Sequence, residues 1–169
     1  MQRYRKATNL PEIITKTLRH LTSGNTGDPK CLKFGVPTVI TTKFDGTQLV
    51  IRLTKNPTLE IEIHGHSSKK PIFKGSLEDF SKGQQKGPKI IPYAYQKVPL
   101  YPIVSLEIPK FLSLMNELGV GNSDFYCELI LPEKSPLNIN YREDLRNKLY
   151  LFTHTYQIKG EYYRDEINP

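Results

Sequence analysis

Residues 49–63 read Leu-Val-Ile-Arg-Leu-Thr-Lys-Asn-Pro-Thr-Leu-Glu-Ile-Glu-Ile and contain the clearest strand pattern in this 169-residue chain. Apolar side chains occupy every second position on both sides of the turn signal Lys55-Asn56-Pro57, which is the spacing of strands with one buried face. The positions predicted to share that face are Leu49, Ile51, Leu53, Leu59, Ile61 and Ile63. We therefore expect a β-hairpin or meander here.

Two helices are predicted where apolar residues recur at helical spacing between a proline and a glycine, from Pro11 to Gly24 and from Pro109 to Gly119. Their apolar faces consist of Ile14, Leu18 and Leu21 in the first, and of Phe111, Leu114, Met115 and Leu118 in the second. Extended stretches are predicted at residues 36–42, 124–130 and 148–153. The pattern as a whole predicts one α+β domain over residues 1–169, with a mainly antiparallel sheet and flanking helices.

The composition fits a domain with a sizeable core, since 37% of the residues are hydrophobic. The formal net charge of +7 makes a polyanion such as nucleic acid a plausible partner, although charge alone does not separate nucleic acid from nucleotides or an anionic membrane. Cys31 and Cys127 are the only cysteines and favour a reducing compartment. No apolar run approaches a membrane span, so we expect no membrane partner and an intracellular protein, cytoplasmic or nuclear, or inside a host cell if viral.

The residues between the hairpin and the second helix are rich in lysine, glycine and proline, which predicts an exposed, mobile basic segment rather than a packed element. Its lysines are candidates to follow a nucleic-acid backbone, and three nearby tyrosines offer stacking surfaces, although a solvated lysine-rich loop would have the same composition. The candidate lysines are Lys69, Lys70, Lys82, Lys86 and Lys89, and the tyrosines are Tyr93, Tyr95 and Tyr101.

The strongest local signal for chemistry is the sequence from Thr42 to Gly46, where Lys43, Asp45 and Gly46 form a Lys-x-Asp-Gly motif between two predicted strands. A lysine at such a bend can attack phosphorus once its pKa is lowered by desolvation or by nearby positive charge. Gly46 would let the backbone approach a phosphate closely. The competing interpretation is an ordinary Asp-Gly turn beside a solvated lysine, because so short a motif also occurs by chance.

Taken with the strands that follow, this motif resembles the covalent nucleotidyltransferases, the RNA ligases, DNA ligases and mRNA capping enzymes. Lys43, Asp45 and Gly46 match their first motif, and residues 125–130 look like their glutamate strand, with Glu128 as the glutamate. Residues 149–152 look like the aromatic strand that follows. Tyr141 and the Lys-Gly-Glu at 159–161 make the later part of the chain most similar to phage-type and fungal RNA ligases.

The resemblance implies that Lys43 takes up AMP from ATP with the help of Mg²⁺ and passes it to the 5′-phosphate of a nucleic acid, RNA rather than DNA. Asp45 and Glu128 would contact the ribose or orient Lys43, and Phe152 or Tyr150 would stack on adenine. Strand alternation independently allows Glu128 to face a cleft, while the alternative is a carboxylate on the solvent side of an edge strand.

Two later motifs of the family, an acidic strand that helps to hold metal and a Lys-x-Lys strand, have no counterpart after Phe152. We therefore expect either the N-terminal portion of a ligase-type nucleotidyltransferase domain or a shortened relative. The alternative function is a catalytically inactive nucleic-acid-binding module on a degenerate form of the same fold. A third possibility is a basic protein-interaction domain with an accidental Lys-x-Asp-Gly.

Two other groups are weaker candidates. Arg52 lies on the strand face opposite Leu49, Ile51 and Leu53, where it could meet a nucleotide phosphate, although a solvated strand face would also account for it. His64 and His66 share a strand face but have no third metal ligand at suitable spacing, so we expect surface histidines and no protein metal site.

Overall fold

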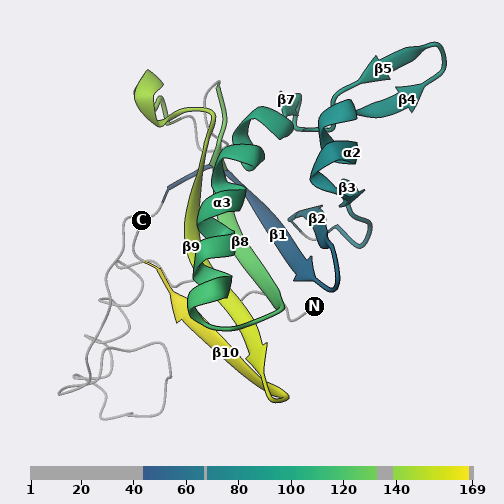
Figure 1. Ribbon diagram of the computed structural model, residues 1–169. Helices are drawn as coiled ribbons and strands as arrows, with labels where there is room; N and C mark the ends of the chain where they lie inside the picture. The colour runs from purple at the N-terminus through teal and green to yellow at the C-terminus, as the bar shows by residue number, and fades with distance from the viewer. Residues whose placement is uncertain (1–43, 67, 133–138, 168–169) are drawn as a thin grey trace, which may run out of the picture. The chain divides into compact units, whose positions relative to one another are not determined.

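A six-stranded antiparallel sheet, in the order β10-β9-β8-β1-β2-β3, is the main element of the chain in the computed structural model (Figure 1). The structure describes residues 44–66, 68–132 and 139–167. The strands of this sheet are β1 (Thr47–Lys55), β2 (Leu59–Gly65), β3 (Phe73–Gly75), β8 (Asn122–Ile130), β9 (Lys148–Ile158) and β10 (Glu161–Glu166). The predicted α+β class with a mainly antiparallel sheet is confirmed, while the helix predicted from Pro11 to Gly24 and the stretch 36–42 lie outside the described residues.

The predicted hairpin consists of β1 and β2, which pair antiparallel with Leu53 opposite Ile61 and Ile51 opposite Ile63. All four of these side chains are fully buried. The expected buried face is therefore confirmed, because alternation along each strand and the cross-strand register bring the same apolar set together.

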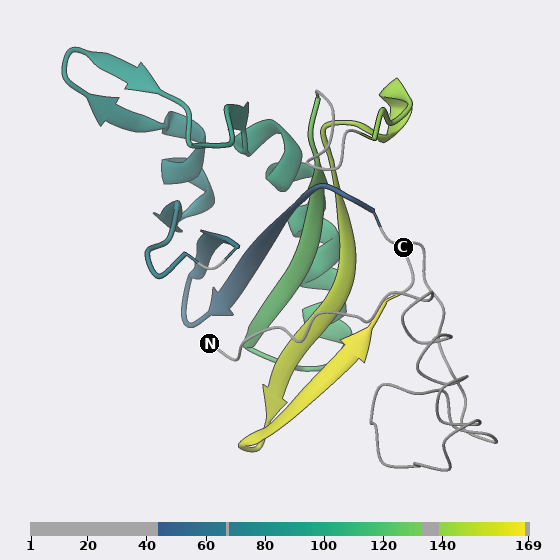
Figure 2. The same ribbon diagram turned by 180° about the vertical axis from the view of Figure 1, so that it is seen from behind.

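Helix α3 (Tyr101–Glu117) corresponds to the helix predicted after Pro109, but its predicted start was wrong. The helix begins with Tyr101 and has a proline, Pro102, in its first turn, so that Pro109 lies inside it. Pro109 has no N–H to donate within the helix, which is tolerated here because Phe111 and Met115 bury the same face. Figures 1 and 2 show α3 across one face of the sheet, over β8 and β9.

The segment between β2 and α3 contains packed elements, so the prediction that it has none was wrong, while its predicted exposure is confirmed at β4 (Gln84–Lys86) and β5 (Lys89–Ile91). It also contains β3, α2 (Leu77–Lys82), β6 (Ala94–Tyr95) and β7 (Val98–Pro99). The physical reason is an aromatic cluster, in which Phe80 of α2 stacks on Phe73 at 4.7 Å and Tyr93 meets Phe73 at 4.8 Å. Ser76 and Asp79 form a capping box that starts α2.

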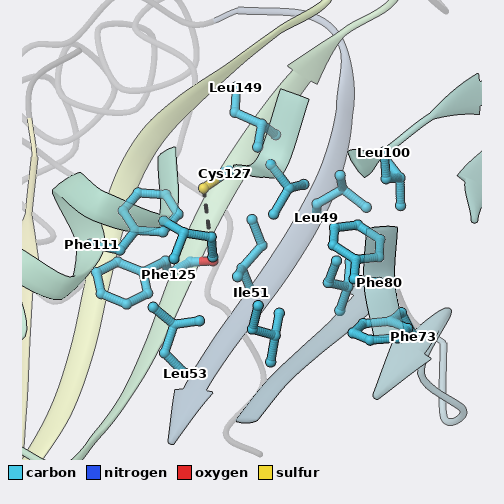
Figure 3. Close-up of a cluster of buried hydrophobic side chains, with 14 of the residues drawn as sticks. Leu49, Ile51, Leu53, Phe73, Phe80, Leu100, Phe111, Phe125, Cys127 and Leu149 are labelled. Atoms are coloured by element: carbon cyan, nitrogen blue, oxygen red, sulfur yellow. Dashed lines mark hydrogen bonds between the residues drawn. The ribbon is translucent and has the colours of Figure 1, made fainter. Parts of the chain in front are cut away.

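The core lies between the sheet and the helices α2 and α3, on the face of the sheet that α3 covers (Figure 3). Phe111 of α3 stacks on Phe125 of β8 with ring centroids 4.2 Å apart, and Phe125 stacks in turn on His154 of β9 at 4.5 Å. Cys127 is a buried free cysteine, and burial raises the pKa of its thiol well above the usual value. The opposite face of the sheet carries Arg52, Asp124 and Glu128 beside the buried side chains of Val50, Tyr126 and Ile130.

Strand β9 extends past the predicted aromatic stretch to Ile158 and turns into β10 through Lys159 and Gly160. Both turn residues have positive φ, 49° and 89°, as a type I′ turn requires. Within the described residues, no helix is both long and apolar enough to cross a membrane.

Candidate functional site

The Lys-x-Asp-Gly motif leads directly into β1, and its described part starts at Phe44. Thr42 and Lys43 lie outside the described residues. The ring of Phe44 stacks on Tyr150 of β9, with centroids 4.2 Å apart and an angle of 23° between the planes. Tyr141 approaches the same ring at 6.1 Å. These contacts hold the residue next to Lys43 against the end of β9.

Gly46 and Glu128 are 82 residues apart in sequence and in direct contact in the structure. The Gly46 backbone N–H donates a hydrogen bond to Glu128 Oε1 at 2.9 Å. Strands β1 and β8 are neighbours with Gln48 opposite Glu128, so the register brings the motif to the glutamate. The structure thus brings together two of the predicted site residues.

This close approach requires glycine at position 46. A Cβ there would lie 2.3 Å from the backbone oxygen of Leu129 and 2.9 Å from its carbonyl carbon, far inside van der Waals contact. The obstacle is the backbone of β8, which the sheet holds in place on both sides. Because it lacks a side chain, Gly46 allows the backbone of the motif to pack directly against the backbone of β8, the strand that carries Glu128.

Asp45 is fixed from a third part of the chain. Its backbone N–H donates to the hydroxyl oxygen of Tyr141 at 2.5 Å. Arg146 in turn donates from Nε to the backbone oxygen of Tyr141 at 2.8 Å, and so holds the loop that carries the tyrosine. The sequence pointed to Tyr141 only through the resemblance to RNA ligases, and in the structure its hydroxyl contacts the motif directly.

Glu128 lies on the predicted face of its strand. Phe125, Cys127 and Leu129 point into the core, and Glu128 is half-buried on the opposite face. The alternative of an edge strand was wrong, because β8 lies between β9 and β1 in the sheet. A carboxylate in the middle of a sheet is sheltered by neighbouring strands, which suits it to hold a fixed contact.

Gln48 and His66 also belong to this part of the site, although Gln48 was not among the predicted site residues and His66 was considered only as a metal ligand. Gln48 Oε1 is 2.7 Å from His66 Nδ1. Gln48 Nε2 is buried, and among the described residues it has no hydrogen-bond partner. A buried donor without a partner beside Glu128 is suited to an acceptor group of a ligand. The register that pairs Gln48 with Glu128 was the signal that could have identified it.

No family matches this chain. The comparison with protein-family models, the search of curated proteins and the search of solved structures each found no similar protein.

Arg52 lies on the same polar face, four residues along β1 from Gln48. Its Nε and Nη2 donate to the two carboxylate oxygens of Asp124 at 2.6 and 3.0 Å. The hydrogen bond to Asp124 raises the pKa of Arg52 despite its partial burial. The two residues line a polar cleft of about 340 Å³ together with Glu62 and Tyr162. A phosphate contact by Arg52 stays a prediction, and it would compete with the Asp124 pair.

Of the two aromatic residues predicted to stack on adenine, Tyr150 already stacks on Phe44. Phe152 is half-buried and occupies the irregular position where the register of β9 against β8 shifts, between Leu151 and Thr153. The shift allows β9 to continue along β8 past this point. A role for Phe152 at the nucleotide stays a prediction.

The two histidines differ in their surroundings. His66 is exposed, but His64 is buried with 6% of its surface accessible, so its predicted place on the surface was wrong. Its Nε2 lies 2.5 Å from Glu62 Oε1, and this hydrogen bond satisfies one polar atom of the buried ring. Burial acts to raise the pKa of Glu62, but His64 and Lys74 outweigh it and the pKa is lowered. No cluster of three or more possible metal ligands occurs in the part of the chain that the structure describes.

The five candidate lysines are not gathered in one place. Lys69 and Lys70 are exposed in the connection between β2 and β3. Lys82 pairs with Glu78 at 2.6 Å within α2, while Lys86 and Lys89 flank the turn between β4 and β5. Tyr93, Tyr95 and Tyr101 pack against the core rather than standing free, which reduces their use as stacking surfaces.

Proposed function

We propose that this chain carries the nucleotide-accepting part of an RNA ligase-like nucleotidyltransferase, with Lys43 as the residue that forms the covalent bond to AMP. The observation that carries the proposal is the contact between Gly46 and Glu128, which joins the first motif to the glutamate strand. Neither the fold class nor the charge requires that contact. A chance Lys-x-Asp-Gly turn would have no reason to lie on a half-buried glutamate from a distant strand.

In the proposed reaction the deprotonated Nζ of Lys43 attacks the α-phosphorus of ATP. A nitrogen–phosphorus bond forms, the bond from the α-phosphorus to the bridging oxygen breaks, and pyrophosphate leaves with the electron pair. An oxygen of a nucleic-acid 5′-phosphate then attacks the same phosphorus, forming an anhydride and returning the electron pair to Lys43. RNA is the preferred acceptor because the motifs resemble those of RNA ligases.

The residues around the motif support this chemistry in separate ways. The Phe44 stack and the hydrogen bond from Asp45 to Tyr141 fix the backbone on the C-terminal side of Lys43. Glu128 and the unpartnered Gln48 Nε2 offer an acceptor and a donor to a ribose or a base. Mg²⁺ supplies neutralisation of the phosphate charge when it is bound. Asp45 and Glu128 could give it one or two carboxylates, and the phosphates of the nucleotide would complete its ligands.

Labelling with α-³²P-ATP and magnesium tests the proposal. The native chain should retain label through denaturing electrophoresis and lose it in acid, as a phosphoramidate does. Lys43→Ala should remove the label. Lys55→Ala is the matched control, because Lys55 lies at the far end of β1 and contacts Asn116 instead of the motif. Label retained in Lys43→Ala, or lost equally in Lys55→Ala, would refute the assignment.

A further inference from the structure

The hairpin formed by β4, the turn Gly87-Pro88 and β5 is here called the basic arm. Figures 1 and 2 show it extending away from the six-stranded sheet. Five of its six strand residues are exposed and the sixth, Ile91, is half-buried, so the arm has almost no core of its own. Two-stranded hairpins are marginally stable alone, and an exposed one needs an anchor on the body of the protein.

Helix α2 provides that anchor. Phe80 of α2 is fully buried and stacks on Phe73. Gly83 follows the helix with φ 76°, and a Cβ at this position would lie 2.5 Å from the backbone oxygen of Ile91. The two strands of the arm therefore meet closely at its base, and the arm is joined directly to a packed helix.

At the tip of the arm two lysines lie directly opposite each other. Lys86 pairs with Lys89 across the turn, where Gly87 takes a φ of 60°. Like charges in opposite positions of an antiparallel pair destabilise it, so folding stability does not account for this pair of lysines. Within the described residues neither lysine forms an ion pair, whereas Lys82 and Lys110 both do.

The sequence around the arm contains no acidic residue. From Phe80 to Leu106 there is no aspartate or glutamate, while Lys82, Lys86, Lys89 and Lys97 all lie in this stretch. The remainder of the chain mixes charges of both signs, so the positive charge here is local rather than a reflection of the average. Lys82 is paired with Glu78, but Lys86 and Lys89 carry positive charge that no acidic residue of the arm offsets, which suits a ligand with repeated negative charges.

We propose that the basic arm binds the sugar-phosphate backbone of a nucleic acid, with Lys86 and Lys89 as the phosphate contacts. This deepens the proposed function, since it assigns a position to the acceptor, and it requires no ATP. Recognition is expected to be independent of sequence, because the nearby tyrosines pack against the core and Ile90 is the only large apolar side chain of the arm that is strongly exposed. With so little apolar surface, the arm suits a phosphate backbone better than insertion into a membrane.

Fluorescence anisotropy of a short labelled single-stranded RNA, measured without ATP at several salt concentrations, tests the inference. The variant K86Q/K89Q should lose two phosphate contacts, which lowers the slope of log K against log salt by about 1.4. When the salt concentration rises from about 50 to about 200 mM, the variant should therefore lose affinity by a factor that is roughly seven times smaller than the factor lost by the native chain. The control K110Q/K159Q removes the same charge from α3 and from the turn between β9 and β10, and it should keep the native slope.

An unchanged slope in K86Q/K89Q would overturn the inference, as would an equal loss in K110Q/K159Q, which would assign binding to total charge. If K86Q/K89Q binds RNA as the native chain does but binds phosphatidylserine vesicles more weakly, the ligand of the arm is a membrane surface instead. The free energy of unfolding should change by less than about 1 kcal/mol in both variants, because K86Q/K89Q relieves one exposed repulsion and K110Q/K159Q removes one exposed ion pair, that of Lys110 with Glu107. Lys43→Ala separates the two proposals, since it should abolish labelling by ATP and leave RNA binding as it is.

Discussion

The substitution Gly46→Ala perturbs the contact between the motif and the glutamate strand most directly. The added Cβ would lie 2.3 Å from the Leu129 backbone oxygen and 3.1 Å from Ile130 Cδ1. An ordinary contact to that oxygen needs about 3.4 Å, so the two chains must separate by roughly 1 Å. That movement stretches the 2.9 Å hydrogen bond from Gly46 to Glu128 beyond bonding distance.

Two contributions set the size of the effect. Overpacking against a fixed backbone costs about 1–3 kcal/mol, and losing a hydrogen bond to a charged group costs about 1.5–3 kcal/mol. We expect the free energy of unfolding to fall by about 4 kcal/mol, which lowers Tm by roughly 10 °C in a chain of this length.

Urea unfolding followed by circular dichroism measures this change, and Gly121→Ala is a matched control. A Cβ on Gly121 would meet only the Lys55 backbone oxygen at 3.5 Å, an ordinary contact, and its φ is not positive. The control should stay within about 0.5 kcal/mol of the native chain or be slightly more stable. Equal stability of the two variants would refute the argument that Gly46 is needed for close approach to β8.

Three further substitutions test the site and the core. Glu128→Gln keeps an oxygen that can accept from the Gly46 N–H, so the free energy of unfolding in a urea titration should change by less than about 1 kcal/mol. Labelling by ATP should nevertheless fall at least about ten-fold, because the carboxylate charge is lost. Unchanged labelling would mean that Glu128 is not part of the site. Tyr141→Phe removes the acceptor for the Asp45 N–H and should cost about 1 kcal/mol in the same titration, whereas a neutral result would mean that water replaces the hydroxyl. Burial lowers the pKa of His154, although Asp165 and Asp124 act in the opposite direction. The imidazole is therefore protonated at a lower pH in the folded chain than in the unfolded chain. Stability should therefore fall as pH drops below about 6.5, by at most about 1.4 kcal/mol per pH unit, and His154→Phe should lack this component in unfolding curves measured across that range.

The parts of the fold that were predicted correctly are the long elements with regular spacing. Strands β1, β2, β8 and β9 each place alternate apolar residues on one face, and this period of two is visible directly in the sequence. The folded segment between β2 and α3 was missed because strands of two or three residues are too short to show a period. Its order comes from contacts such as Phe73 with Phe80, which no local pattern displays.

The site was predicted in part for a similar reason. Asp45, Gly46 and Glu128 were selected by motif, and alternation along β8 predicted the face of Glu128. The role of Gln48 depends on the register of β1 against β8, and a register cannot be read from either strand alone. The ion pair between Arg52 and Asp124 was missed for the same reason, since it joins two strands across the sheet.

Intact-mass measurement after incubation with ATP and magnesium, followed by peptide mapping, shows whether Lys43 takes up AMP. We expect a chain heavier by one AMP, with the added mass on the peptide that contains Lys43 and no other. An unmodified chain under conditions where it is folded, or AMP attached to a different lysine, would contradict this expectation.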